Sequence, residues 1–433
     1  MRGISNHGRM ALGGVSVIMA IALLSSTASA GGFAVREQSA SLLGSAFAGA
    51  AAGGDLSSAF WNPAAFGTAQ SGLSTESHGT VIIPTSELSN GKTSIDTKTP
   101  LGVIPFNIGG ANSTEIDKLG VLSASYSAYR INDKLVLGLS VNSPFGLATD
   151  PENGNWVGRI HGREAQMLTF NAAPTLAYEI MPGVQIAAGL QVEYMKLKLW
   201  FASSPAPGAA STSIKLTDDA SIGATAGILL TPMAGTRIGI GWRSSISHSL
   251  EGDLNNYPAS KKVVNVSADL DTPDIVTASL SQTIMPGLRA LGTIEWTNWS
   301  NIGTITVQGF TNPITRKPLA IDANWDDGWF FSGGLEYDYS PTVTVRGGVA
   351  YEISPIQEPT QRLVQLPDSD RVWLSIGGTI HYSESTSFDL AFSHVIFEDA
   401  HIHRGSLASP NLLLDADVSQ NANILSASVK TRW

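Results

Sequence analysis

Few residues of this chain have the types and spacing that catalysis or metal binding requires. His401 and His403 could bind a metal ion, but the sequence shows no third ligand. Ser393 and His394 could suggest a hydrolytic pair, yet adjacent strand residues point to opposite faces. Asp415-x-Asp417-x-Ser419 has the spacing of the first calcium-loop ligands, without the central Gly and closing Glu. No catalytic residue, metal site or cofactor is therefore expected, and an enzyme is the least favoured class.

Cations could do a simpler kind of chemistry, the binding of a carboxylate. Lys196, Lys198, Arg243 and Arg346 stand in segments that are expected to be strands. Each of them could bind an anionic headgroup. The alternative is an ion pair with an acidic residue on a neighbouring strand, which is common inside barrels. The interpretation of these cations depends on the elements that position them.

Composition narrows the class of protein. The 433 residues include 44 Gly and no Cys, and only 14% are charged against 43% hydrophobic. Outside the N-terminus there is no run of 18 apolar residues, so spanning helices are not expected. Low charge without a spanning helix fits a membrane β-barrel, in which one face of every strand meets lipid. The net charge of −10 argues against a nucleic-acid partner, and the lack of Cys excludes disulfides and thiolate sites.

The first thirty residues are typical of an export signal. Arg2 and Arg9 precede an apolar stretch at 11–24, and the small residues Ala28-Ser29-Ala30 form a cleavage site. The mature chain is expected to begin at Gly31. A retained membrane anchor is the alternative, but the apolar stretch is short for a span.

Residues 31–71 and 72–433 differ in character. The first segment is rich in Gly, Ala and Ser and suits a hatch that folds back as a plug, because small side chains allow close packing inside a lumen. The second alternates between period-2 segments and turns, which predicts an all-β fold, a transmembrane antiparallel β-barrel of about 14 strands. The expected strands are 72–84, 118–131, 133–145, 165–181, 183–201, 218–232, 235–250, 272–286, 288–300, 327–340, 342–354, 370–384, 386–399 and 422–433.

The faces and connections of these strands favour a membrane barrel over a soluble sandwich. In 342–354, Val345, Val349 and Tyr351 share one face, and Arg346 and Glu352 share the other. The connections alternate between short turns and long loops, as in outer-membrane barrels, and a sandwich has no reason for this asymmetry. The long loops are expected at 85–117, 146–164, 202–217, 251–271, 301–326, 355–369 and 400–421.

Aromatic residues and the chain end agree with this interpretation. The last residues, ILSASVKTRW, alternate and end in Trp433, which resembles the signal that the barrel assembly machinery reads. Tryptophans near strand ends, including Trp296, Trp299 and Trp325, could belong to interfacial girdles or to loops.

Two motifs give the chain a family resemblance. Gly32-Phe33, the stretch from Glu37 to Ala51, and Asn62-Pro63-Ala64 resemble the hatch of the outer-membrane long-chain fatty acid transporter family. Ser143-Pro144-Phe145-Gly146-Leu147-Ala148-Thr149, followed by Trp156-Val157-Gly158-Arg159, is similar to the same family. The resemblance covers the hatch and the first third of the barrel.

The resemblance implies a fourteen-stranded barrel whose hatch closes the lumen. It implies that a hydrophobic ligand is captured by outer loops, moves to an internal pocket near Phe33, and leaves after the hatch rearranges. It also implies a kinked third strand beside Asn62-Pro63-Ala64. Pro144, within Ser143-Pro144-Phe145-Gly146, cannot donate to the ladder, so it should either kink the strand or end it. Lys196 lies where the family can place a basic pocket residue.

Two loops have apolar stretches that could capture a ligand, Leu101-Gly102-Val103-Ile104-Pro105-Phe106, and Phe201 with Pro205-Ala206-Pro207. They could instead pack on each other over the barrel mouth.

The sequence therefore predicts a channel in the outer membrane of a Gram-negative bacterium that takes up long-chain fatty acids or similar hydrophobic compounds. An aromatic-hydrocarbon channel of the same family is the alternative, and a general porin or a surface adhesin is less favoured. The expected partners are the hydrophobic ligand, outer-membrane lipid and the barrel assembly machinery. A monomer is expected, because release through the wall needs a free wall.

Overall fold

The computed structural model of the chain describes residues 31–99, 102–255, 263–312, 316–407 and 411–433, with side chains omitted for 96–106. The predicted signal peptide, 1–30, and the apolar stretch at 101–106 therefore lie outside the described residues or side chains.

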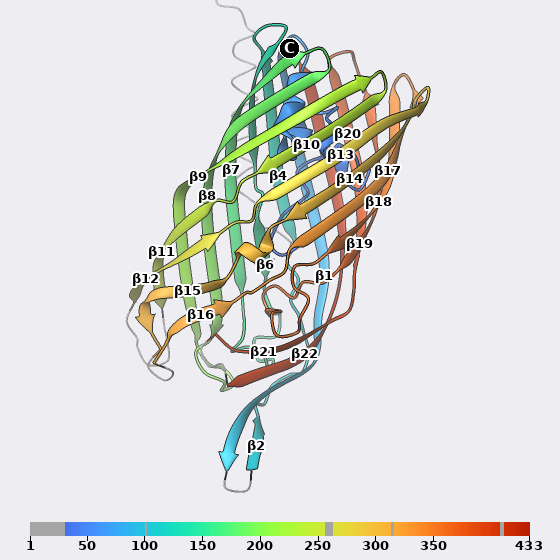
Figure 1. Cartoon of the computed structure of the whole chain (residues 1–433). Coiled ribbons are helices and arrows are strands. Elements are labelled where there is room, and N and C mark those ends of the chain that lie inside the picture. Colours follow the sequence, from blue (N-terminus) through green and yellow to red (C-terminus); the bar gives the residue numbers. More distant parts are fainter. Residues whose placement is uncertain (1–30, 100–101, 256–262, 313–315, 408–410) are drawn as a thin grey trace, which may run out of the picture.

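Fourteen strands form one closed antiparallel ring, which confirms the predicted all-β barrel (Figure 1). Each strand pairs with the next, and the last pairs with the first over Ser74–Ile95 of β1. Closure gives each of the fourteen strands a neighbour on both sides, as a wall in lipid requires. The fourteen are β1 (Gly72–Thr99), β4 (Gly120–Arg130), β5 (Leu135–Asn142), β7 (Ala165–Met181), β8 (Val184–Ala202), β9 (Ser211–Met233), β10 (Thr236–Arg243), β13 (Ile275–Met285), β14 (Leu288–Thr297), β17 (Gly328–Ser340), β18 (Val343–Ile353), β19 (Arg371–His381), β20 (Thr386–Phe397) and β22 (Leu412–Arg432).

Eight further strands occupy segments that the sequence assigned to loops or to strand ends. Strands also run well past their expected ends, as β22 does from Leu412 onward. The predicted loops 251–271, 301–326 and 400–421 were therefore wrong in extent. These ladders lie beyond the apolar belt, where no lipid-facing alternation marks them. The further strands are β2 (Gly102–Asn107), β3 (Thr114–Glu115), β6 (Gly146–Thr149), β11 (Ser247–Asn255), β12 (Val264–Asp271), β15 (Thr304–Thr311), β16 (Pro318–Asp322) and β21 (Ala400–Gly405).

The outer face of the ring is an apolar belt. On β18, Val349 is 57% exposed, whereas its neighbour Ala350, which faces the lumen, is 4% exposed. The same alternation continues on other strands, with Leu190, Ile222 and Leu390 all more than half exposed. In a soluble barrel the apolar side chains would point inward, whereas here they point outward. This confirms the prediction that the apolar strand faces meet lipid.

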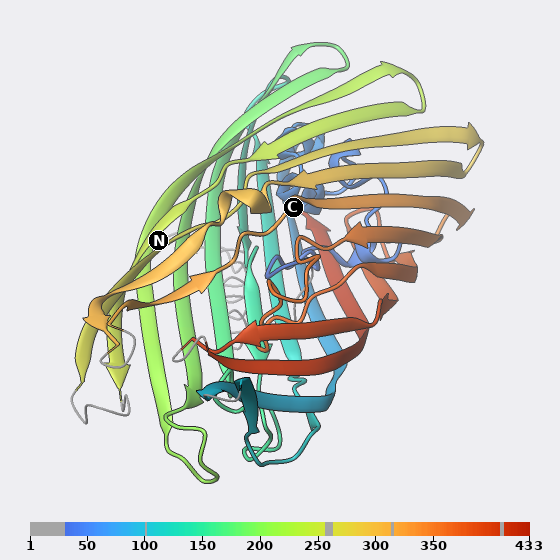
Figure 2. The same ribbon diagram turned by 60° about the horizontal axis from the view of Figure 1, so that its bottom comes forward.

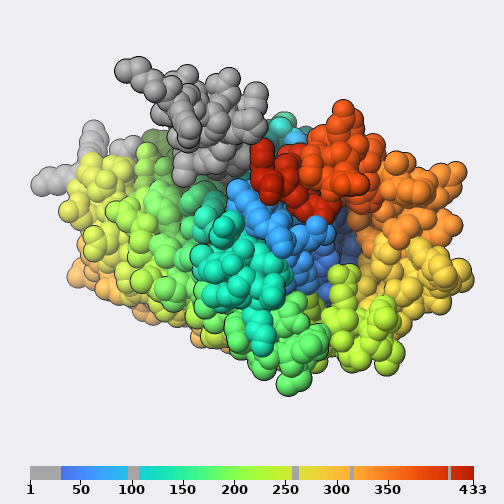
Figure 3. Space-filling view, turned by 90° about the horizontal axis from the view of Figure 1, so that it is seen from above, coloured from blue at the N-terminus to red at the C-terminus, as the bar shows by residue number. Residues whose placement is uncertain are grey.

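The segment 31–71 lies inside the ring, at the end that carries the short turns (Figures 1 and 2). Seen from that end, dark blue atoms of this segment are visible between the surrounding strands (Figure 3). We call this segment the hatch. It contains α2 (Ala40–Leu43), η2 (Ala50–Ala52), η3 (Leu56–Phe60) and η4 (Pro63–Thr68), and a further 3-10 turn, η5 (Trp299–Asn301), follows β14. No helix in the described part of the chain is long and apolar enough to cross a bilayer.

Glycines of the wall let the hatch come close to the strands. A Cβ added to Gly239 would lie 1.7 Å from the Ala51 carbonyl oxygen, and one added to Gly348 would lie 2.0 Å from the Ser45 oxygen. Both glycines lie on the inner face of the ring. The small residues of the hatch thus meet small residues of the wall, which explains why Gly is abundant in the strands as well as in the plug.

Candidate functional site

The third strand of the barrel, made of β5 and β6, is interrupted where the sequence predicted a kink or an end. β5 stops at Asn142 and β6 begins at Gly146, and both pair with β7. Pro144 lies in the break, and its carbonyl accepts a hydrogen bond from the Val35 N–H at 2.8 Å. Since Pro has no N–H to give to a ladder, the break frees Ser143, Pro144 and Phe145 to face the hatch.

The hatch continues the sheet at this break. Ala34 forms a bridge with Phe145, and the Gly146 N–H donates to the Phe33 carbonyl at 2.8 Å. The first residues of the hatch are therefore fixed against the interrupted third strand. This contact places the Phe33 side chain inside the lumen.

Phe33 packs into an aromatic cluster. Its ring lies 4.7 Å from Trp299, 5.8 Å from Phe145 and 5.9 Å from Trp325, centroid to centroid. Phe33 and Trp299 are at most 3% exposed. Trp299 and Trp325 thus lie inside the lumen and not in an interfacial girdle.

A cavity of about 430 Å³ lies next to Phe33, between the hatch and the outer loops. Its wall is mostly apolar, and it is formed by the hatch, by segments from β6, β7, β8, β12, β15, β16 and β21, and by the loops next to them. The apolar lining residues include Phe33, Leu147, Met167, Leu197, Leu199, Phe201, Leu270, Ile305, Ile321, Trp325, Leu363, Val364, Leu366, Ile402 and Leu407. Phe201, which the sequence placed in a capture loop, is buried in this wall.

Two guanidinium groups line the same cavity. Arg362 donates to the backbone oxygens of Ile356, Asp368 and His401 at 2.7–2.9 Å. Arg404 donates in the same way to three backbone oxygens of neighbouring loops. Within the described residues, no side-chain carboxylate lies within 4 Å of Arg362 or Arg404. Neither guanidinium is in a direct ion pair within the described residues, although the charge of Asp322, which also lines the cavity, acts on Arg404, and those of Asp368, Asp370 and Glu358 act on Arg362.

Two residues of the cavity wall each have a buried polar side-chain atom without a hydrogen-bond partner among the described residues, Nδ1 of His161 and Nε1 of Trp325. His161 is 7% exposed, and its Nε2 lies 2.8 Å from the Leu412 carbonyl oxygen. Burial lowers the pKa of His161 to about 4, so the ring is neutral at physiological pH. Since a carbonyl only accepts, Nε2 donates its proton to Leu412, and the backbone carbonyls of Arg404 and Gly158 also interact with the ring.

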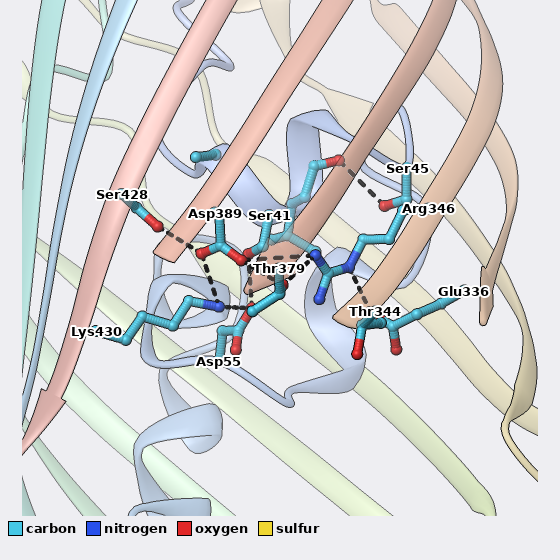
Figure 4. A network of polar contacts seen from close by, with 12 residues as sticks. Ser41, Ser45, Asp55, Glu336, Thr344, Arg346, Thr379, Asp389, Ser428 and Lys430 are labelled. Atoms are coloured by element: carbon cyan, nitrogen blue, oxygen red, sulfur yellow. Dashed lines mark hydrogen bonds and ion pairs between the residues drawn. The ribbon is translucent and has the colours of Figure 1, made fainter. Parts of the chain in front are cut away.

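The predicted cation Arg346 is an ion-pair residue and not a pocket residue. Its Nε lies 2.5 Å from Glu336, and a second nitrogen lies 3.6 Å from Asp389 (Figure 4). Lys430 extends this network, because its Nζ lies 2.6 Å from Asp55 of the hatch and 3.0 Å from Asp389. The ion-pair alternative thus describes Arg346, and the network ties the hatch to the wall.

The other three predicted cations also lie away from the cavity, and Lys198 shares the outer face of β8 with Lys196. Arg243 stacks on the Phe60 ring of the hatch at 4.6 Å and donates to the Phe60 carbonyl. Lys196 alternates with Met195 and Leu197, which are buried, so it lies on the outer face of β8. The prediction that Lys196 faces the lumen was therefore wrong. At this level of the barrel the inner face is apolar, because it lines the cavity, so polarity does not mark the lumen side.

Asn62-Pro63-Ala64 caps η4 inside the hatch. The Asn62 side chain accepts from the Ala64 N–H at 3.0 Å and donates to the carbonyls of Ala51 and Ile228. Pro63 occupies the first helical turn, where its missing N–H leaves no bond unmade. The turn therefore joins two hatch segments to β9 of the wall.

Arg362, Arg404, His161 and Trp325 were missed as cavity residues by the sequence reasoning. Arg362 and Arg404 lie in segments assigned to outer loops, where a charged residue is ordinary. Nothing in the sequence around them, Glu358 to Gln361 before Arg362 and His401 to His403 before Arg404, marks them as cavity residues.

A closed barrel with an apolar belt, an internal plug and an apolar cavity above the plug defines a plugged outer-membrane channel. Comparisons identify its family. Residues 21–433 match the model of the family described as outer membrane protein transport protein (OMPP1/FadL/TodX), and the chain belongs to this family. It is thus a protein of the Gram-negative outer membrane, and its short-turn end faces the periplasm.

Relatives and solved structures agree. The chain is 26% identical to a long-chain fatty acid transport protein of Escherichia coli O6:H1 over 88% of this chain and 90% of that protein. It is 23% identical to outer membrane protein P1 of Haemophilus influenzae over 88% and 89%.

Among solved structures, a FadL homologue of Pseudomonas aeruginosa superposes with a TM-score of 0.81 at 19% identity, over 93% of this chain and 99% of that one. The toluene transporter TbuX of Ralstonia pickettii superposes with a TM-score of 0.60 at 16% identity, over 88% and 94%. At these identities the structures show a shared fold.

Proposed function

We propose that this protein is a passive channel for the uptake of long-chain fatty acids across the outer membrane. The observation that carries the proposal is the cavity beside Phe33, which combines an apolar wall with the guanidinium groups of Arg362 and Arg404. An acyl chain gains about 0.8 kcal/mol for each CH₂ that leaves water. A carboxylate gains a charge-assisted hydrogen bond from a guanidinium that is held by backbone oxygens and is not in a direct ion pair.

The cavity can serve as an intermediate binding site on the path of the ligand through the barrel. Outer loops would capture the ligand, and the cavity would hold it against Phe33, at the tip of the hatch. Movement of the hatch would then open the way onward. Phe33 is hydrogen-bonded to Gly146, and Val35 is hydrogen-bonded to Pro144. Displacing Phe33 therefore disturbs the contact between the hatch and the interrupted third strand.

The break supports a lateral exit through the wall. β4 pairs with β1 along Gly120–Ala124, but in the described part of the chain no ladder joins these residues to β5 or β6. We propose that the ligand leaves here, into the membrane. A free wall for this exit is the reason to expect a monomer.

The first experiment is a titration of the purified protein with radiolabelled hexadecanoate, with toluene as a competitor. We expect saturable binding that toluene does not displace. Arg404→Gln and Arg362→Gln should each weaken binding roughly tenfold, because each removes one charge-assisted hydrogen bond. Lys196→Gln is the matched control, since Lys196 lies on the outer face of the barrel.

Other outcomes separate the alternatives. Toluene binding without hexadecanoate binding would support an aromatic-hydrocarbon channel, as in the toluene transporters that share this fold. Binding of neither, with a large steady conductance in planar bilayers, would support a general porin and contradict the proposal.

A further inference from the structure

Lysine side chains lie on the outward face of β8 and β9, just beyond the apolar belt of the barrel. On β8, Leu190 and Val192 are 58% and 41% exposed, and Lys196 and Lys198 follow on the same face. β8 begins after a short turn, so its lysines lie toward the end of the wall that faces away from the periplasm. They therefore meet the outer leaflet of the membrane.

Lys198 and Lys215 form a like-charge pair across the ladder. Lys215 of β9 lies directly opposite Lys198, and the two strands are neighbours in the ring (Figure 1). Both ammonium groups lie over the Trp200 ring, 5.8 and 6.0 Å from its centroid. The charge of Lys196 also acts on Lys198. Like charges directly opposite each other destabilise a ladder, and a shared aromatic ring at an exposed site offsets only part of this repulsion.

The carboxylates nearby do not neutralise the pair. Among the residues that the structure describes, no side-chain carboxylate lies within 4 Å of either ammonium group. Asp253 of β11 lies opposite Lys215 in the ladder without forming such an ion pair. Glu164, whose charge acts on Lys198, is itself 3.5 Å from Lys118. The pair of lysines is therefore a site that an anion from outside the chain would stabilise.

We propose that Lys198 and Lys215 bind a phosphate group of lipid A, the phosphorylated glycolipid in the outer leaflet of Gram-negative outer membranes. A phosphate monoester carries a charge of about −1.5 to −2 at pH 7 and has three acceptor oxygens, so a single group meets both ammonium ions. The acyl chains of the lipid lie along the apolar belt, against exposed side chains such as Val192 and Phe170.

The level of the pair on the wall favours a lipid headgroup. Tyr194 precedes the lysines on the outward face of β8, where an aromatic side chain is typical of the membrane interface. Lys198 follows four residues later, about 13 Å along the strand, and a long lysine side chain can reach back toward that interface. The cavity lies on the other face of β8, where Leu197 and Leu199 line it, so this inference does not depend on the proposed function.

The experiment measures the binding of radiolabelled lipid A and of its dephosphorylated form to the purified protein in detergent. EDTA is present, because divalent cations would otherwise bridge phosphates to carboxylates such as Asp253. We expect saturable binding of lipid A. The double variant Lys198→Gln/Lys215→Gln should bind it about 30-fold more weakly, since each lysine near an anionic lipid surface contributes about fivefold. Removing the phosphates from the lipid should have a similar effect on the unaltered protein.

Two variants serve as controls. Lys198→Arg/Lys215→Arg keeps both charges and should retain most of the affinity for lipid A, because guanidinium groups also bind phosphate. Lys134→Gln removes a charge between β4 and β5, at a short turn on the periplasmic side, and should leave lipid A binding unchanged. Heat-dependent migration on gels verifies that the barrel of each variant is folded.

Three outcomes would overturn the inference. Equal binding of lipid A and its dephosphorylated form would show that acyl packing alone holds the lipid. Unchanged affinity of Lys198→Gln/Lys215→Gln would show that the phosphate binds elsewhere. Phosphatidylglycerol, whose phosphodiester carries a single charge, should compete more weakly than lipid A, and equal competition would show a surface for any anionic lipid. Hexadecanoate binding by the unaltered protein separates each of these outcomes from a failure of the proposed function.

Discussion

Replacing Gly239 with Ala should open the channel without unfolding the barrel. The added methyl group would lie 1.7 Å from the Ala51 carbonyl oxygen and 2.9 Å from Asn62 Nδ2, although Cβ atoms essentially never approach within 3.0 Å. The carbonyl must then retreat by about 1.3 Å, the difference between these limits. That movement breaks the 2.8 Å hydrogen bond from Asn62 to Ala51, because both of its atoms are displaced.

The size of the effect follows from the cost of overpacking. A methyl group forced into a packed interface costs about 1–3 kcal/mol, and the closed state alone bears this cost. The population with an unseated hatch should therefore rise by about 5- to 150-fold. Gly241→Ala acts at a second point of the same contact, since its methyl group would lie 1.9 Å from the Trp61 carbonyl oxygen.

The assay is the frequency of channel openings in planar bilayers. Gly333→Ala is the matched control, because the space around Gly333 is empty to 4 Å and the residue lies in a neighbouring part of the same ring. Openings as rare in Gly239→Ala as in the unaltered protein would refute the argument that close packing on wall glycines seats the hatch. If Gly333→Ala opened as often as Gly239→Ala, the openings would not result from the contact between Gly239 and the hatch.

Two further predictions concern charges on the hatch. Burial raises the pKa of Glu37 to about 7, so the neutral carboxyl stabilises the closed hatch at low pH, and this stabilisation is lost as pH rises from about 4.5 to 7. Protection factors of the hatch amides in hydrogen exchange should be higher at about pH 5.5 than at about pH 8, and Glu37→Gln should remove the difference. Lys430→Gln leaves Asp55 and Asp389 without their shared cation, so it should destabilise the hatch by about 3 kcal/mol in chemical unfolding, with the exposed Lys134→Gln unchanged. Unaltered unfolding of Lys430→Gln would show that this pair does not secure the hatch.

The sequence was sufficient for the wall. Alternation on segments such as 342–354 placed Val345 and Val349 outside and Glu352 inside, because lipid and lumen impose opposite requirements on adjacent residues. Small residues in 31–71 marked the plug. Such patterns are local, and each is set by the surroundings of one strand or segment.

The sequence was insufficient where a residue's role depends on a distant partner. Arg346 and Arg362 are equally cationic, but Arg346 meets Glu336 and Asp389, whereas Arg362 meets only backbone oxygens. Lys196 was misplaced for a related reason, since the apolar cavity beside β8 reverses the usual polarity of the two strand faces. No spacing in the chain encodes these differences.

The chain alone thus determined an exported, outward-apolar barrel with a small-residue plug, because these features follow from side-chain periodicity and composition. Only the tertiary structure decided where the cavity lies and which charges remain available in it. The wall of the cavity includes Phe33, His161, Arg362 and Arg404, which lie far apart in the sequence. They meet only because the barrel closes and because the interrupted third strand holds the tip of the hatch below the outer loops.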